Sequence, residues 1–220
     1  MKHDQDKIHS SYGVLKKVLP AKVCEWIRAL ANAFLTPILF SHMSGHFKSS
    51  LSQKAVSVEG KAIPWYTYPV IDFLRSKDFK DKIVLEFGGG QSTIWWGERA
   101  KKVITFEGNK IWYEELKRMV LSNTEVHLVT MESQEKCISE IREQLRKNEI
   151  KSYDIIIIDG LYRENLTDVA CEFVSSDGVI ICDNFESYDY SRLKNYPFKR
   201  VDFWGHAPGV IQAHCASIFF

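Results

Sequence analysis

Apolar residues occur along this chain in short continuous runs, and between them lie longer stretches in which apolar positions repeat at helical spacing. Short continuous runs are typical of parallel strands that are buried on both faces. They predict strands at residues 84–87, 103–107, 125–130, 155–158 and 179–182, and two final strands at residues 199–205 and 216–220. Helices are predicted at residues 65–77, 92–100, 110–122, 134–148 and 166–174. This alternation indicates an α/β fold, with a mostly parallel seven-stranded sheet and helices on both faces.

Residues 21–40 form a further apolar stretch near the N-terminus. Lys22, Glu25 and Arg28 interrupt its first half and Pro37 its second half. We therefore predict an amphipathic helix and no membrane-spanning helix. Such a helix could cover the sheet, pair with a second subunit in a homo-oligomer, or lie on a membrane surface.

The composition sets the scale of the molecule. With 220 residues and 45% hydrophobic content, the chain can bury one sizeable core. We predict one domain at residues 64–220, preceded by a helical extension or lid at residues 1–63. The net charge of +1 gives no overall field that would attract nucleic acid, so the expected partner is a small molecule.

The cysteines indicate the compartment. They are odd in number, lie far apart and form no C-x-x-C pair, which argues against a disulfide framework and against a zinc site. They are Cys24, Cys137, Cys171, Cys182 and Cys215. The N-terminus also lacks the pattern of a signal peptide. A cytoplasmic location is therefore expected.

The first predicted strand ends in an acid, Glu86, and three glycines follow it at Gly88, Gly89 and Gly90. Glycines directly after a buried strand allow a tight turn and a close approach to a ligand. A dinucleotide-binding G-x-G-x-x-G motif would need glycine where this chain has Thr93. A carboxylate at this place suits a cationic ligand and would repel a phosphate.

Other predicted strands also end in acids. Glu107 lies 21 residues after Glu86 and fits the position that binds a ribose diol. Asp159 and the pair Asp183–Asn184 follow two further strands, so their oxygens can meet at one edge of the sheet. Oxygen ligands of this kind suit Mg²⁺. The alternative is that Asp183 and Asn184 shape the pocket and cap a turn without binding metal.

The order of these motifs over residues 82–184 resembles the class I S-adenosylmethionine (SAM)-dependent methyltransferases, and in particular the catechol O-methyltransferase-like metal-dependent enzymes. The resemblance implies a Rossmann-like methyltransferase fold. It implies a SAM site formed by Glu86, Gly88, Gly89, Gly90, Ser92, Thr93, Glu107, Gly108, Met131, Glu132, Ser133 and Asp159. Asp159, Asp183 and Asn184 match the ligands of the family's catalytic metal, which would be Mg²⁺.

Two features depart from that family. Gly160-Leu161-Tyr162-Arg163 stands where the family carries a lysine base, and the glycine loop is shorter. Substrate recognition is expected from loops outside the matched region, at residues 44–50, 64–66 and 203–209. The histidines of these loops and of the C-terminal segment are interpreted as solvated or hydrogen-bonded residues. They are His46, His206 and His214.

The expected reaction is transfer of the methyl group of SAM to a hydroxyl of a small molecule, such as a sugar or a phenol. Two alternatives are an NAD-dependent oxidoreductase and a non-catalytic nucleotide-binding subunit. Asp159, Asp183 and Asn184 favour an enzyme, since a binding module needs no second set of polar groups beside the cofactor.

Overall fold

The computed structural model describes residues 19–160 and 162–220. The chain divides into two compact units, with the boundary between Ser44 and Gly45. The N-terminal unit contains α2 (Ala21–Met43). The sequence places the domain boundary at residue 63, whereas residues 45–63 belong to the same compact unit as the sheet.

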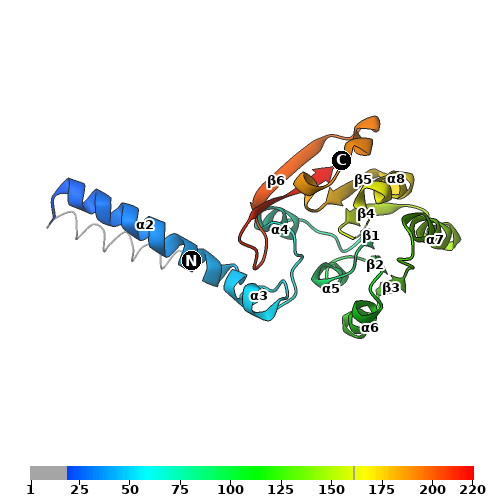
Figure 1. Cartoon of the computed structure of the whole chain (residues 1–220), viewed down its shortest axis with the longest axis horizontal. Helices are drawn as coiled ribbons and strands as arrows, with labels where there is room; N and C mark the ends of the chain where they lie inside the picture. Colours follow the sequence, from blue (N-terminus) through cyan, green and yellow to red (C-terminus); the bar gives the residue numbers. More distant parts are fainter. Residues whose placement is uncertain (1–18, 161) are drawn as a thin grey trace. The chain divides into compact units, whose positions relative to one another are not determined.

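The second unit is a sheet with helices around it (Figure 1). Its helices are α3 (His46–Ser52), α4 (Tyr68–Arg75), α5 (Gln91–Gly97), α6 (Lys110–Met119), α7 (Gln134–Lys147) and α8 (Arg163–Phe173). Its strands are β1 (Ile83–Phe87), β2 (Lys102–Glu107), β3 (Thr124–Leu128), β4 (Tyr153–Ile158), β5 (Val174–Cys182), β6 (Arg200–His206) and β7 (Ala213–Phe219). Two short 3-10 helices, η1 (Phe185–Ser187) and η2 (Ser191–Asn195), lie between β5 and β6.

The seven strands form one sheet in the order β3-β2-β1-β4-β5-β7-β6. The first five strands are parallel to their neighbours, and β7 runs antiparallel to β5 and β6. The predicted fold class is therefore confirmed. Because β7 is antiparallel, its amino end lies at the edge of the sheet where the parallel strands end.

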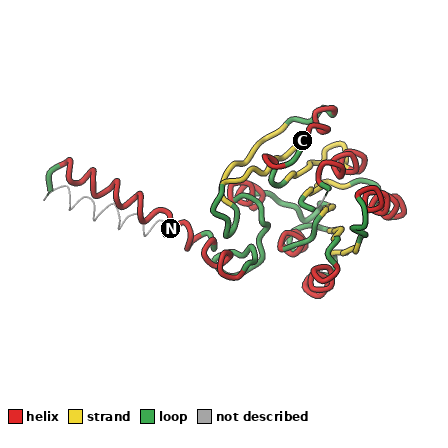
Figure 2. The backbone as a smooth tube through the Cα atoms, viewed as in Figure 1, coloured by secondary structure: helices red, strands yellow, loops and turns green. Residues whose placement is uncertain are grey.

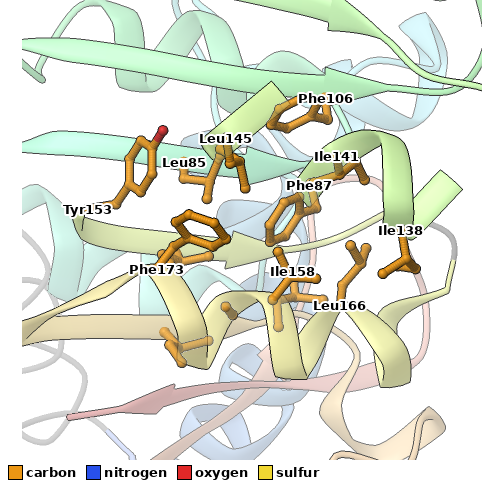
Figure 3. Close-up of a cluster of buried hydrophobic side chains, with 14 of the residues drawn as sticks. Leu85, Phe87, Phe106, Ile138, Ile141, Leu145, Tyr153, Ile158, Leu166 and Phe173 are labelled. Carbon is orange, nitrogen blue, oxygen red and sulfur yellow. The ribbon is translucent and has the colours of Figure 1, made fainter. Parts of the chain in front are cut away.

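Helices cover both faces of the sheet (Figure 2). On one face, the alternate residues Leu85, Phe87 and Ile158 pack with α7 and α8, as Figure 3 shows. On the other face, Val84 and Ile157 pack with α4 and α5. Strands with both faces buried explain why the sequence has continuous apolar runs in place of an alternating pattern.

The N-terminal helix α2 exposes large apolar side chains. Within it Cys24 is buried, while Trp26 and Phe34 are 71% and 68% exposed. The helix continues through Pro37, so this proline does not divide the apolar stretch. By length and composition α2 could cross a membrane, although core helices and signal sequences can share these properties. The expectation of an amphipathic, non-spanning helix stays a prediction.

Candidate functional site

The glycine loop joins the ends of three strands. Gly88 has φ +98°, and a Cβ there would lie 2.6 Å from Cα and N of Gly160, the residue after Asp159. The next amide, that of Gly89, donates to Glu107 Oε2 at 2.9 Å, and the Gly89 carbonyl accepts from Trp112 Nε1 at 2.7 Å. The loop is thus held against the ends of β4 and β2.

Glu86 lies beneath this loop and is fully buried. Its carboxylate accepts hydrogen bonds from the hydroxyls of Ser92, Thr93 and Thr105. Burial raises the pKa of Glu86 to about 7, although these three hydrogen bonds act in the opposite direction. Glu86 therefore ties β1 to α5 and β2. Glu86 is not among the residues that line the two cavities described below, its contacts are with hydroxyls of this chain, and its contact with a cofactor stays a prediction.

The raised pKa of Glu86 predicts how the free energy of unfolding changes with pH. The folded chain holds this proton between about pH 4.5 and 7, where the unfolded chain has lost it, so the free energy of unfolding falls as pH rises through this window. Glu86→Gln keeps a neutral group at the site and is expected to remove this decline, which amounts to about 3 kcal/mol. Urea unfolding from pH 5 to 8 measures it. Glu114→Gln, on the exposed surface of α6, is the control. Equal slopes in the wild type and Glu86→Gln would contradict the shift.

A cavity of about 550 Å³ opens beside the glycine loop, at the ends of β1, β2 and β4. Six of the predicted cofactor residues line it, namely Gly88, Gly89, Glu107, Gly108, Met131 and Asp159. Each oxygen of Glu107 accepts one backbone N–H, from Gly89 at 2.9 Å and from Asn109 at 2.6 Å. A carboxylate has about four acceptor positions, so Glu107 retains acceptor capacity toward a ligand.

The other predicted cofactor residues are not among those that line this cavity. Ser92 and Thr93 bind Glu86, and Thr93 also accepts from the amide of Gly90 at 3.0 Å. Ser133 accepts from the amide of Lys136 at the start of α7, and Glu132 pairs with the Lys136 ammonium at 2.6 Å. Their contacts in the structure are local, and their contact with a cofactor stays a prediction.

Arg163, at the start of α8, connects the three predicted metal ligands. Its guanidinium donates to Asp159 Oδ1 at 2.8 Å, to Asn184 Oδ1 at 3.1 Å and to the Asp183 carbonyl at 2.7 Å. It also donates to the carbonyls of Gly160 and Asp159 and stacks on the Tyr188 ring, with Cζ 4.5 Å from the ring centroid. A fixed cation therefore lies among the oxygens that were predicted to bind Mg²⁺.

This arrangement does not fit a divalent metal. Asp159 and Asn184 direct oxygens to the guanidinium, and a metal ion at the same place would be repelled by it. Among residues 19–160 and 162–220, no group of three or more His, Cys, Asp or Glu side chains could hold a metal ion. The predicted Mg²⁺ site has no support in the structure, and the positions of Asp159 and Asn184 are explained by Arg163.

Asp183 is 4% exposed. Burial, and then the negative charge of Asp159, raises the pKa of Asp183 well above its ordinary value, and the nearby guanidinium of Arg163 offsets this only in part. Asp159, Asp183 and Arg163 form a cluster of two acids and one guanidinium, and this cluster favours a proton on Asp183 and a charge on Asp159. Asp183, at the end of β5, thus holds a proton more readily than Asp159 does.

A second cavity, of about 290 Å³, lies next to the first and shares Asp159 with it. Its lining residues come from the ends of β4 and β5, from the loop before α4 and from the β6–β7 hairpin. They are Trp65, Asp159, Asp183, Asn184, Ala207, Val210 and His214. Two of the three segments expected to recognise substrate, residues 64–66 and 203–209, contribute Trp65 and Ala207 to this lining. In the third segment, residues 44–50, His46 accepts a hydrogen bond from the Gly209 amide at 3.2 Å.

Arg163 and His214 are two residues of the site that were not predicted. Arg163 was seen as a departure from the resembling family and given no role, and His214 was interpreted as an ordinary polar residue. The position of Arg163 four residues after Asp159 was the available signal for a contact between them. Nothing in the local sequence indicated that His214 would lie beside Asp183.

No family model and no curated protein matches the chain. Solved structures do match. The O-methyltransferase TomG from Streptomyces achromogenes, involved in tomaymycin synthesis and solved with SAM, is 14% identical over 83% of this chain and 88% of its own, with a TM-score of 0.55. A precorrin-6y C5,15-methyltransferase from Geobacter metallireducens is 13% identical over 78% and 95%, with a TM-score of 0.54. An O-methyltransferase from Bacillus cereus, solved with SAH, is 16% identical over 63% and 74%, with a TM-score of 0.50.

The chain has the class I methyltransferase fold. In this fold a parallel sheet places its ligands beyond the carboxyl ends of the strands, which is where both cavities lie. Two of the three similar structures are named O-methyltransferases and the third is named a C5,15-methyltransferase, so the fold alone does not select an acceptor. For this chain the acceptor has to be argued from its own second cavity.

Proposed function

We propose that the chain is a SAM-dependent methyltransferase that methylates a hydroxyl of a small molecule, a sugar or a phenol. One observation carries this proposal, namely that two cavities meet at Asp159 at the carboxyl edge of a methyltransferase sheet. A volume of about 550 Å³ lies within the range of cofactor sites, and the smaller cavity beside it has room for a ring.

The lining of the larger cavity fits SAM. Glu107 retains acceptor positions suited to a ribose diol, and Met131 offers an apolar wall suited to adenine. When bound, SAM supplies an electrophilic methyl group. The residues of this chain would hold the methyl group and the acceptor oxygen in line, an effect that contributes up to roughly 7–11 kcal/mol.

The alternatives are less well supported by the same lining. An NAD⁺ pyrophosphate would meet the carboxylates of Glu107 and Asp159, while the guanidinium of Arg163 is already engaged by groups of this chain. A binding subunit without activity would not need the second cavity.

Isothermal titration calorimetry with SAM, SAH and NAD⁺ separates these functions. We expect both adenosyl ligands to bind, with or without Mg²⁺, and NAD⁺ not to bind. Binding of NAD⁺ alone would overturn the proposal.

Glu107→Gln is predicted to weaken SAM binding by about 10-fold to 100-fold, because hydrogen bonds to a charged acceptor contribute about 1.5–3 kcal/mol. Calorimetric titration of the variant with SAM measures the change in Kd. Glu114→Gln, on the exposed face of α6, is expected to bind like the wild type. An unchanged Kd in Glu107→Gln would remove Glu107 from the cofactor site.

We also propose a cytoplasmic location. No disulfide joins the five cysteines in the described part of the chain, and four of them are buried, which supports a reducing compartment. For the partners we propose a small-molecule acceptor rather than nucleic acid, since the net charge is +1. For α2 we propose contact with a second subunit or a membrane surface rather than a membrane span, and its exposed apolar side chains support such a contact.

A further inference from the structure

His214 and Glu186 form a hydrogen-bonded pair beside the second cavity. His214 lies at the start of β7 and lines the cavity, and its Nδ1 is 2.9 Å from Glu186 Oε1. The other oxygen, Glu186 Oε2, accepts from the Cys215 amide at 2.9 Å. The carboxylate of Glu186 is thus held in place from two sides, and it in turn holds the imidazole ring of His214.

The electrostatics of the pair define the tautomer of the ring. Burial acts to raise the pKa of Glu186, but the hydrogen bonds from His214 and from the Cys215 amide outweigh it, so its pKa lies below the ordinary value. An ionised Glu186 accepts only, so Nδ1 of His214 carries the proton. Nε2 then has its lone pair available, as in other histidine–carboxylate pairs.

The other acids of the cavity are less suited to accept a proton. Asp159 is paired with Arg163 at 2.8 Å, and burial raises the pKa of Asp183 well above its ordinary value, so the charged form of Asp183 is disfavoured. The loop at residues 160–163 offers no lysine in place of the base expected from the resembling family. Among the described residues that line this cavity, His214 is the best available base.

We infer that the cavity of about 290 Å³ is the acceptor site and that His214, oriented by Glu186, removes the proton of the acceptor hydroxyl. This inference rests on the proposed function. Nε2 takes the proton while the oxygen forms a bond to the methyl carbon of SAM. The carbon–sulfur bond breaks and its electron pair stays on sulfur, which leaves neutral S-adenosylhomocysteine. The imidazolium then releases its proton to water.

The lining indicates the class of acceptor. Trp65 offers an aromatic surface against which a ring can pack, and Asn184 and Asp183 offer polar groups for its substituents. His214 and these polar groups surround a space in which a single ring fits. The acceptor class is therefore a ring that carries hydroxyl groups, and no metal ion is needed to lower the pKa of the hydroxyl because a base lies beside it.

A first experiment needs no acceptor. Long-range proton–nitrogen spectra of histidine-labelled protein report the tautomer of each ring, and His214→Gln assigns the signal. With SAH present at pH 8, we expect protonated Nδ1 and bare Nε2 at His214, and a loss of this preference in Glu186→Gln. The pair His127 and Glu125, 3.5 Å apart on β3, is the internal control, and the tautomer signal of His127 should not change in Glu186→Gln. A proton on Nε2 in the wild type would overturn the inference.

A second experiment measures transfer from radiolabelled SAM to catechol, phenol and methyl glucoside. General-base catalysis contributes about 10²–10⁴-fold, so His214→Gln should lose at least 100-fold in kcat with an unchanged Kd for SAM. Glu186→Gln should lose less. Imidazole should restore part of the activity to His214→Ala, and His127→Gln should remain active.

Equal kcat in His214→Gln and the wild type would overturn the inference, as would SAM binding without transfer to any of these hydroxyl compounds. Failure to bind SAM would refute the proposed function instead.

Discussion

Arg163→Met is expected to destabilise the fold by about 3–5 kcal/mol and to abolish SAM binding, because it leaves the half-buried charge of Asp159 without its partner. Arg163 is 9% exposed, and its guanidinium donates to groups on the two segments that follow β4 and β5. Methionine can fill much of the volume but can satisfy none of these acceptors. Urea unfolding and calorimetric titration with SAM measure the two effects.

Two further variants test the reason for this loss. Arg163→Lys keeps the charge but cannot reach Asp159, Asn184 and the Asp183 carbonyl with one ammonium, so it should recover only part of the stability. Arg192→Met removes an arginine that pairs with Asp168 on the surface and should cost less than 1 kcal/mol. Added Mg²⁺ should not stabilise the wild type. A loss below 1 kcal/mol in Arg163→Met would contradict the structural role of its guanidinium, and a gain from Mg²⁺ in the wild type would restore the metal hypothesis.

The fold was predictable because its signals are local. Residues 155–158 are four consecutive isoleucines, and such a run fits a strand buried on both faces. β1, β2, β4 and β5 have mostly apolar runs, whereas β3, at the edge of the sheet, is more polar, and the helices between the strands begin and end within a few residues of the predicted positions. The cofactor cavity followed from the fold, because the polar residues after buried strands share one edge of a parallel sheet.

The partners of the buried charges were less predictable because they depend on tertiary contacts. Glu86 was expected to face a ligand, but Thr105 lies 19 residues away and becomes its neighbour only when β2 pairs with β1. His214 lies 28 residues after Glu186 and reaches it because β7 inserts between β5 and β6. The sequence predicts two final strands without their order, so it could not place His214 at the site.

Gly88→Ala is the second change with a large expected effect. The added Cβ would lie 2.6 Å from backbone atoms of Gly160, and φ +98° is rare for any residue with a side chain. The left-handed conformation costs about 1–2 kcal/mol. Separating the two loops adds about 1–3 kcal/mol. Thermal and urea unfolding should show this loss. Binding of SAM should weaken at least tenfold, because the loops after β1 and β4 both line the larger cavity.

Gly90→Ala is the matched control for this change, two residues away in the same loop. Gly90 has φ −170°, an extended conformation that alanine adopts freely, and its Cβ would meet only Ser92 Oγ at 3.7 Å. We expect Gly90→Ala to keep the stability of the wild type. Equal losses in the two variants would mean that this loop needs glycine for flexibility along its whole length. A loss confined to Gly88→Ala would identify the close contact between Gly88 and Gly160 as the feature that holds the cavity in shape.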